Sequence, residues 1–283
     1  MVAISLDYAA PDCALKDFVS VFYEFRADVP VFEDLERADL AQFRFKLSPG
    51  PGEYRFADGH IQAAPDIQIM GPTTGMTHVR VEGPVHVFGA GLLPAGWAAL
   101  LGIEASTMLN RVLDATELFG KGLYQVADQF RAAETLEQRV AIGNRLADDL
   151  ARNARELPFW FTRTVDAWLS DTLSPEVIDL VKATGLSRRQ VERYCKRFYG
   201  APPKLLARKY RALRAAVALA KGETDVDKLL EQGFYDQSHF IREIKQFTGI
   251  TPKRFAEDLP TLARLTLKRG DLAGQVGPLV SDT

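Results

Sequence analysis

Two short segments of this 283-residue chain carry polar and basic side chains at helical spacing. An arginine guanidinium can donate two hydrogen bonds to one guanine, and a glutamine amide can pair with adenine in the same way. Such side chains read a base sequence only if they project together from one face of a helix. The candidates for contact with base edges are Arg189, Glu192 and Arg193 in the first segment and Gln237, Ser238 and Arg242 in the second.

Each segment also has an apolar stripe that would bury the opposite face of its helix. The stripes, at spacings i, i+4 and i+7, are Val191, Cys195 and Phe198 in the first segment and Phe240, Ile244 and Phe247 in the second. Lysine side chains and the groups at a helix N-terminus can hold phosphates. The candidates for contact with a nucleic-acid backbone are Ser187, Arg188 and Lys196 in the first segment and Asp236, His239 and Lys245 in the second.

Capping residues indicate the helices that would position these side chains. Ser187 and Asp236 are favourable N-cap residues, and a turn containing glycine precedes each of them. We therefore expect helices over 187–198 and 236–247. A shorter helix precedes each one, over 176–183 and 225–232, so that each unit is a helix, a turn and a second helix.

Prolines indicate where the remaining helices of this part begin. Ser174 and Pro175 predict an N-cap followed by proline at the first helical position. Pro203 predicts the start of a long helix that reaches Lys221 and is capped by Gly222. This helix would connect the two units.

The two units are related by an internal repeat of 49 positions. Residues of the first unit recur in the second with the same type or character, and the two N-caps obey the same offset. The repeated set is Val191, Arg193, Lys196, Phe198, Gly200, Pro203 and Lys204, matched by Phe240, Arg242, Lys245, Phe247, Gly249, Pro252 and Lys253. One supersecondary unit is therefore used twice.

The formal net charge of -2 conceals a strong asymmetry along the chain. Residues 1–173 hold 15 Lys and Arg against 24 Asp and Glu, whereas residues 174–270 hold 20 against 11. A basic C-terminal third on an acidic body is typical of a module that binds a polyanion. Solvated lysine and arginine faces are the alternative explanation.

The first hundred residues have the alternating pattern of β-strands cut by glycine and proline. We expect strands within 18–25, 41–56, 61–70 and 78–91, forming an antiparallel sandwich or small barrel. From Pro94 to about residue 157 the period is helical. The stripe in the last of these helices is either a dimer contact or the face that docks on the domain: Leu136, Val140, Leu146 and Leu150. The predicted fold class is thus α+β, with a β-rich N-terminal domain and an all-helical C-terminal domain.

The basic part resembles the C-terminal domain of the AraC/XylS family of transcription regulators. The stretch GLSRRQVERYCKRFYGAPP is similar to the first signature of that family, and GFYDQSHFIREIKQFTGITPKRF to the second. The resemblance implies two helix-turn-helix units within about 165–260, joined by the long helix and placed in successive major-groove segments about 34 Å apart. Val181, Leu229, Cys195 and Ile244 depart from the usual residue types, but they are apolar exchanges that a core can absorb.

The N-terminal part is similar, more loosely, to the cupin-like sensor domains that precede some AraC-type domains. The run from 88 to 120 carries this resemblance. It implies an effector-sensing domain over 1–120, helices over 121–160 that mediate homodimer formation, and a tail over 261–283. The expected partners are double-stranded DNA, a small-molecule effector and RNA polymerase, in an activator or a repressor.

Two other functions stay open from the sequence. A metal-dependent cupin enzyme would need clustered histidines and a carboxylate, but His60, His78, His86 and His239 form no His-x-His pair. We expect no catalytic residue, metal or cofactor, although His78 and His86 could meet across a hairpin turned at 82–84. An adaptor that binds another protein would keep the same helices without binding DNA.

The sequence also bears on the compartment. The first residues lack the pattern of a secretory signal, and no apolar run approaches the roughly 18 residues that a membrane span requires. The two cysteines, Cys13 and Cys195, suit a reducing environment. We expect a cytoplasmic protein.

Overall fold

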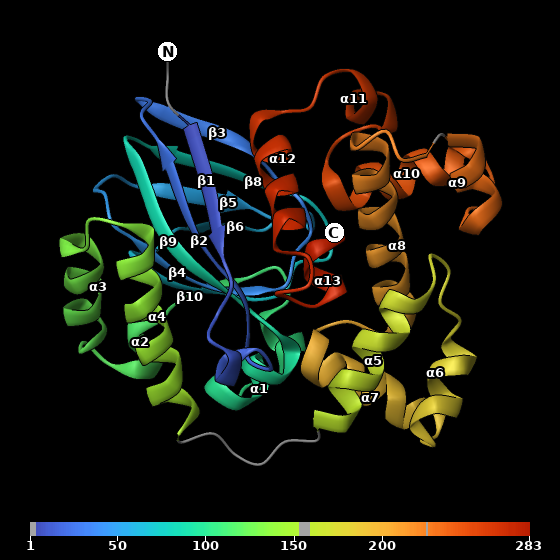
Figure 1. The fold of residues 1–283 in the computed structure, drawn as a ribbon, viewed down its shortest axis with the longest axis horizontal. Helices are drawn as coiled ribbons and strands as arrows, with labels where there is room; N and C mark the ends of the chain where they lie inside the picture. Colours follow the sequence, from blue (N-terminus) through green and yellow to red (C-terminus); the bar gives the residue numbers. More distant parts are fainter. Residues whose placement is uncertain (1–3, 153–158, 225) are drawn as a thin grey trace.

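The computed structural model describes residues 4–152, 159–224 and 226–283. Two antiparallel sheets form the N-terminal part, and helices form the C-terminal part (Figure 1). This is the α+β organisation that the sequence predicts.

The strands form a sandwich of two sheets. One sheet has six strands in the order β1-β2-β9-β4-β7-β10, and the other has four in the order β3-β8-β5-β6. All the strand pairs are antiparallel. Their bounds are β1 (Ile4–Ala9), β2 (Val19–Ala27), β3 (Val31–Glu36), β4 (Ala41–Lys46), β5 (Gly52–Arg55), β6 (Ile61–Ala63), β7 (Ile67–Met70), β8 (Thr77–Glu82), β9 (Val85–Leu92) and β10 (Val112–Asp114).

Three of the predicted segments each contain two strands in the structure. The segments 41–56, 61–70 and 78–91 all split between the two sheets, because each turn carries the chain from one sheet to the other. The predicted hairpin between His78 and His86 is therefore wrong: His78 binds Glu33 on β3, and His86 binds Glu24 on β2. Strands β1, β3 and β10 were not predicted.

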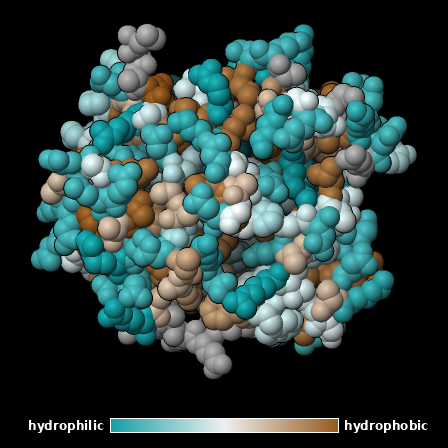
Figure 2. All heavy atoms as spheres, in the orientation of Figure 1, coloured by the Kyte–Doolittle hydropathy of each residue, from teal (hydrophilic) through white to brown (hydrophobic). Residues whose placement is uncertain are grey.

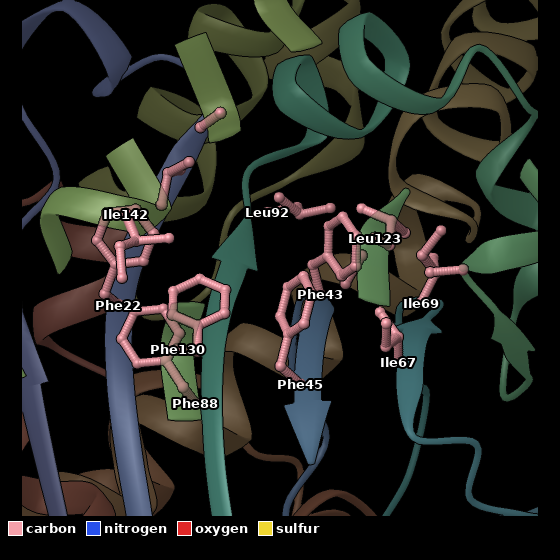
Figure 3. Close-up of a cluster of buried hydrophobic side chains, with 14 of the residues drawn as sticks. Phe22, Phe43, Phe45, Ile67, Ile69, Phe88, Leu92, Leu123, Phe130 and Ile142 are labelled. Carbon is pink, nitrogen blue, oxygen red and sulfur yellow. The ribbon is translucent and has the colours of Figure 1, made fainter. Parts of the chain in front are cut away.

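Helices cover the outer face of the six-stranded sheet. The large apolar residues of β2, β4, β7 and β9 point toward α3 (Leu123–Ala132) and α4 (Leu136–Ala151). Figure 3 shows this for Phe22, Phe43 and Phe88, with Phe130 of α3 beside Phe88. The stripe of Leu136, Val140, Leu146 and Leu150 packs against this core. These four side chains are only half-buried, and the fully buried face of α4 carries Ile142, Gly143 and Ala147.

Shorter elements connect this layer to the sheets. They are η1 (Cys13–Leu15), α1 (Pro94–Leu101), η2 (Ala105–Met108) and α2 (Thr116–Phe119). The helix α4 begins at the capping box that the sequence indicates, formed by Thr135 and Gln138. The end that the sequence assigns to this helical region, at Pro158, lies outside the described residues.

The C-terminal helices follow the predicted order from α6 onward, whereas α5 was not predicted. They are α5 (Phe159–Asp171), α6 (Val177–Thr184), α7 (Arg188–Tyr199), α8 (Pro203–Ala220), α9 (Val226–Gly233) and α10 (Gln237–Thr248). Ser187 and Asp236 are N-caps, as expected. The start of α6 is a correction, because Glu176 is the N-cap and Ser174 and Pro175 lie outside the helix.

The last residues form short helices packed on the sandwich. These are α11 (Pro252–Glu257), α12 (Thr261–Thr266), η3 (Leu267–Leu272) and α13 (Pro278–Ser281). In Figure 1, α12 lies between the strands and α8, and Leu262 joins the core between the two sheets. Lys268 on η3 binds Asp7 on β1. The segment 261–283 is thus a folded link between the two parts rather than a loose tail.

Helix α5 supports the first helix-turn-helix unit through a buried polar contact. The Tyr199 hydroxyl lies 2.6 Å from Asp166 Oδ1 and 2.9 Å from the Thr162 carbonyl oxygen. Burial raises the pKa of Asp166 to about 7, although the hydroxyl of Tyr199 acts in the opposite direction. A protonated Asp166 can donate to Tyr199, which then donates to Thr162.

We predict that this carboxyl group makes stability depend on pH. The unfolded chain loses the Asp166 proton near the ordinary pKa of 3.8, but the folded chain keeps it until about pH 7. Its contribution to the free energy of unfolding therefore falls as pH rises through this window. Chemical denaturation should show the stability of Asp166→Asn gaining about 1–3 kcal/mol relative to wild type between pH 4 and pH 8. A difference that stays constant with pH contradicts the prediction.

Candidate nucleic-acid interface

The predicted base-contacting residues lie on the outer faces of α7 and α10. Arg189, Arg193, Gln237, Ser238 and Arg242 are exposed, and Glu192 is half-buried. The opposite faces are buried in the apolar clusters that the stripes predict, with Val191, Cys195, Phe240, Ile244 and Phe247 fully enclosed. Both sets of side chains are therefore free to meet a ligand that approaches from outside.

Contacts within each helix order part of this surface. Arg188 Nε lies 3.6 Å from Glu192 Oε1, and Arg242 Nε donates to the Ser238 carbonyl oxygen at 3.2 Å. Ser187 forms a capping box with Gln190, and Asp236 Oδ1 accepts from the backbone N–H of His239 at 2.7 Å. Lys196 and Lys245 are exposed on the same helices. The predicted backbone-contacting residues are thus brought to the helix starts and outer faces, except for His239.

His239 instead faces a buried ion network under α10. Its Nε2 atom lies 3.2 Å from Glu243 Oε1, and the Glu243 side chain is only 1% exposed. Arg208 Nε and Arg211 Nη2, both from α8, approach the same carboxylate at 2.5 Å and 2.8 Å. The charge-assisted bonds of this network fix α10 against α8, directly beneath the exposed side chains.

The family comparison agrees with this geometry. A family model described as a helix-turn-helix domain matches residues 180–258. These residues form an AraC-type helix-turn-helix domain. The domain marks the chain as a DNA-binding transcription regulator. A search of curated protein sequences found no match to the chain.

Solved structures resemble the chain only in outline. ToxT from Vibrio cholerae, bound to an unsaturated fatty acid, has a TM-score of 0.46 and 9% identity, over 86% of this chain and 97% of that one. ToxT bound to (E)-4-(8-methylnaphthalen-1-yl)but-3-enoic acid also has a TM-score of 0.46, with 10% identity, over 90% and 98%. The AraC-like transcriptional activator CuxR has a TM-score of 0.33 and 14% identity, over 74% and 86%.

The AraC-type domain supports its two recognition helices in different ways. Position 243 in α10 corresponds by the repeat to Tyr194 in α7, whose ring packs at 86° to that of Phe161 on α5, with centroids 5.2 Å apart. At this one position α7 is held by aromatic packing and α10 by ions, while both helices also bury their apolar stripes. Sequence reasoning did not identify Glu243 as functional. The sequence feature that could have indicated Glu243 is an acidic residue in a basic helix, at the position where the first unit has the aromatic Tyr194.

The histidines and acidic residues do not assemble a metal site. Among the residues that the structure describes, no group of three or more His, Cys, Asp or Glu side chains could hold a metal ion. Within the same residues, no helix is long and apolar enough to cross a membrane. The face seen in Figure 2 is mainly hydrophilic, with apolar residues in small groups.

We predict that the Glu243 network is essential for the stability of the AraC-type domain. The substitution Glu243→Gln keeps the shape of the side chain but leaves Arg208 and Arg211 without their charged partner, so it should cost about 3 kcal/mol. Glu192→Gln is the matched control, because its carboxylate is 45% exposed and 3.6 Å from Arg188. The control should cost less than about 1 kcal/mol. Equal losses, measured by chemical denaturation, would show that burial adds nothing to the pairing.

Proposed function

We propose that this regulator binds DNA sequence-specifically and reads two successive major-groove segments, one with α7 and one with α10. The observation that carries the proposal is the presence of two sets of polar and basic side chains on the outer faces of repeat-related helices. Arg193 and Arg242 are one such pair, separated by 49 positions, and both are exposed. Arginine at these positions suits guanine, and Gln237 suits adenine.

The connecting helix supports this arrangement. Helix α8 has 18 residues and is therefore about 27 Å long. One turn of DNA is about 34 Å, so two units at the ends of such a helix are spaced appropriately for neighbouring grooves on one side of a duplex. Residues from both ends of α8 are buried, those near its start with the first unit and those near its end with the second.

The proposed regulator acts without catalysis. The exposed basic residues lie on two recognition helices. This arrangement favours DNA rather than a protein as the binding partner, because the phosphates of the DNA backbone complement lysine and arginine. An adaptor remains testable, since its binding would not select a DNA sequence. A cupin-type enzyme would require a ligand set that the described residues do not bring together.

We further propose that a small molecule regulates the protein by entering the space between the two sheets. A cavity of about 90 Å³ lies there, closed at one end by Leu262, Thr266 and Arg269 from the C-terminal segment. Such a volume is several times that needed for one water molecule. Tyr54 lines this cavity, while Phe43, Phe45 and Phe88 belong to the core under α3 and α4.

The chemistry of the cavity favours an apolar molecule with an anionic end. Its walls include Phe25, Phe32 and several valines. At one edge Arg37 has two guanidinium nitrogens, Nε and Nη1, that are buried without a hydrogen-bond acceptor among the described residues. A buried donor without a partner is costly, and a carboxylate would satisfy it. Arg44, deeper inside, is already paired with Glu36 at 2.9 Å.

Other expectations remain predictions. Homodimer formation, contact with RNA polymerase and a cytoplasmic location rest on the sequence alone.

We predict that Arg193→Ala and Arg242→Ala each weaken binding to the preferred DNA sequence. Selection from a random DNA pool would identify that sequence for the wild-type chain. Loss of a bidentate arginine contact should then cost about 1–3 kcal/mol and relax selection at the contacted position. Affinity should also fall steeply with salt concentration.

The control for this experiment is Arg131→Ala on α3, which removes the same charge far from α7 and α10. It should leave sequence preference unchanged. Equal weakening for every DNA sequence would show that Arg193 and Arg242 hold only phosphates. Failure of the wild-type chain to enrich any sequence would overturn the proposed function.

We predict that short apolar carboxylic acids raise the melting temperature of the protein and that their methyl esters do not. The acid would bind the folded state alone and stabilise it by mass action. Arg37→Met should abolish the shift, because it removes the two guanidinium nitrogens, Nε and Nη1, that lack an acceptor among the described residues. Arg26→Met on β2 is the control, since the Arg26 side chain is 50% exposed and paired with Glu24. Equal shifts of the melting temperature with the acids and with their methyl esters would refute the proposal that the ligand has an anionic end.

A further inference from the structure

The N-terminal part of the chain contacts the ends of both recognition helices. Gly200 and Gly249, related by the repeat, are the C-caps of α7 and α10, with φ angles of 79° and 77°. A Cβ atom on Gly200 would lie 2.8 Å from Pro72 Cγ, and one on Gly249 would lie 2.9 Å from Leu35 Cδ1. Both helix ends are therefore packed directly on loops of the sandwich.

The second helix end is also hydrogen-bonded to these loops. The backbone N–H of Ala38 donates to the Phe247 carbonyl oxygen at 2.7 Å, and that of Met76 donates to the Gln246 carbonyl oxygen at 3.1 Å. Carbonyl groups in the last turn of a helix have no partner within the helix. The loops 37–40 and 71–76, which lie outside the AraC-type domain, thus supply hydrogen-bond donors to the last carbonyl groups of α10.

The two loops are joined to each other and to α8 at a single point. Asp39 N donates to Thr73 Oγ1 at 2.8 Å, and Thr73 N donates to the Asp39 carbonyl oxygen at 3.2 Å. The buried Lys209 Nζ from α8 donates to the carbonyl oxygens of Asp39 at 2.6 Å and Thr73 at 3.0 Å. Together these bonds form a junction of Asp39, Thr73 and Lys209.

The opposite side of the same loop lines the cavity between the sheets. Arg37 and Asp39 line that cavity, whereas Ala38 between them is fully buried in the cluster of α8 and α10 residues. Asp39 is also paired with Arg269, whose Nη2 atom lies 2.6 Å from Asp39 Oδ2. Three consecutive residues therefore contact the cavity and the end of the second recognition helix at once.

We propose that Asp39, Thr73 and Lys209 are positioning residues for DNA reading. Through the loops 37–40 and 71–76 they set the orientation of α10. A molecule in the cavity acts on α10 through residues 37–39. This inference rests on the proposed function. It assigns regulation to the second recognition helix in particular, because the loop 37–40, whose residues Arg37 and Asp39 line the cavity, is hydrogen-bonded to the end of α10. The end of α7 packs instead on Pro72, Ala105 and Leu109.

The first test measures positioning without DNA, by hydrogen exchange of the full chain. Lys209→Met removes the amine from the junction but preserves much of its volume, and burial already lowers the pKa of this lysine to about 7. The Ala38 and Met76 amides should exchange at least about tenfold faster than in wild type, with no change in β2. Lys221→Met, at a 37% exposed lysine that ends the same helix, should leave all of these rates unchanged. Unchanged exchange of Ala38 and Met76 in Lys209→Met overturns the proposal.

Thr73→Val provides a second variant of nearly equal volume that removes the bond from Asp39 N to Thr73 Oγ1. It should accelerate exchange of the Ala38 and Met76 amides. This variant keeps the proposal testable if Lys209→Met fails to fold. Slow exchange in this variant would also count against the junction.

The second test measures DNA reading with operators in which only one half is scrambled. Lys209→Met should reduce discrimination at the half contacted by α10 by about tenfold, the loss of a single base-specific contact, and leave the other half within about twofold. Equal loss at both halves would show a general structural role and overturn the positioning assignment. Absence of any preferred sequence for the wild-type chain would instead refute the proposed function, and the exchange result would stand by itself.

Discussion

The hydrogen bonds of Lys209 Nζ connect the main parts of this protein. A lysine amine is costly to bury, and here it is held by two backbone carbonyl oxygens, those of Asp39 and Thr73. Because Lys209 lies on α8, these bonds fix the sandwich to the helix that supports both helix-turn-helix units. The nearby pair of Asp39 and Arg269 extends the same connection to the C-terminal segment. The position of the sandwich relative to α7 and α10 thus depends on a few polar contacts between backbone and buried charge.

The internal repeat gives two units of the same local structure but different tertiary support. Local features such as the N-cap, the apolar stripe and the C-cap glycine recur because they are required for each helix to form and pack. Position 243 does not recur, since α5 packs an aromatic surface on the first unit whereas Arg208 and Arg211 surround Glu243 in the second. Each unit thus has its own ionisable contact beneath a recognition helix, Asp166 with Tyr199 in the first and Glu243 with Arg208 and Arg211 in the second.

The sequence predicted the helical part well because its signals are local. Ser187, Asp236 and the two glycines after α7 and α10 define helix ends to within about one residue. The sandwich was predicted only as a class, because the assignment of a strand to one of two sheets depends on partners far along the chain. In β4, alternation correctly indicates that Phe43 and Phe45 share a face, but it suggests solvent for Gln42 and Arg44. These two residues are instead buried, 6% exposed each, between the sheets.

A network of buried polar side chains accounts for the burial of Gln42 and Arg44, which the alternation of polar and apolar residues in β4 did not predict. Arg44 donates to Gln42, Tyr54 and Glu36, and Tyr54 in turn donates to Gln68. An apolar interior would have been more stable than this network, because every member must be desolvated and then satisfied. A sandwich that only supported the DNA-binding helices would not require it. The network around Arg44 is satisfied, whereas two nitrogens of Arg37 are not, and this difference favours a cavity that accepts the polar group of a ligand beside Arg37. Arg37 is one residue from Ala38, whose N–H donates to the carbonyl oxygen of Phe247 at the end of α10.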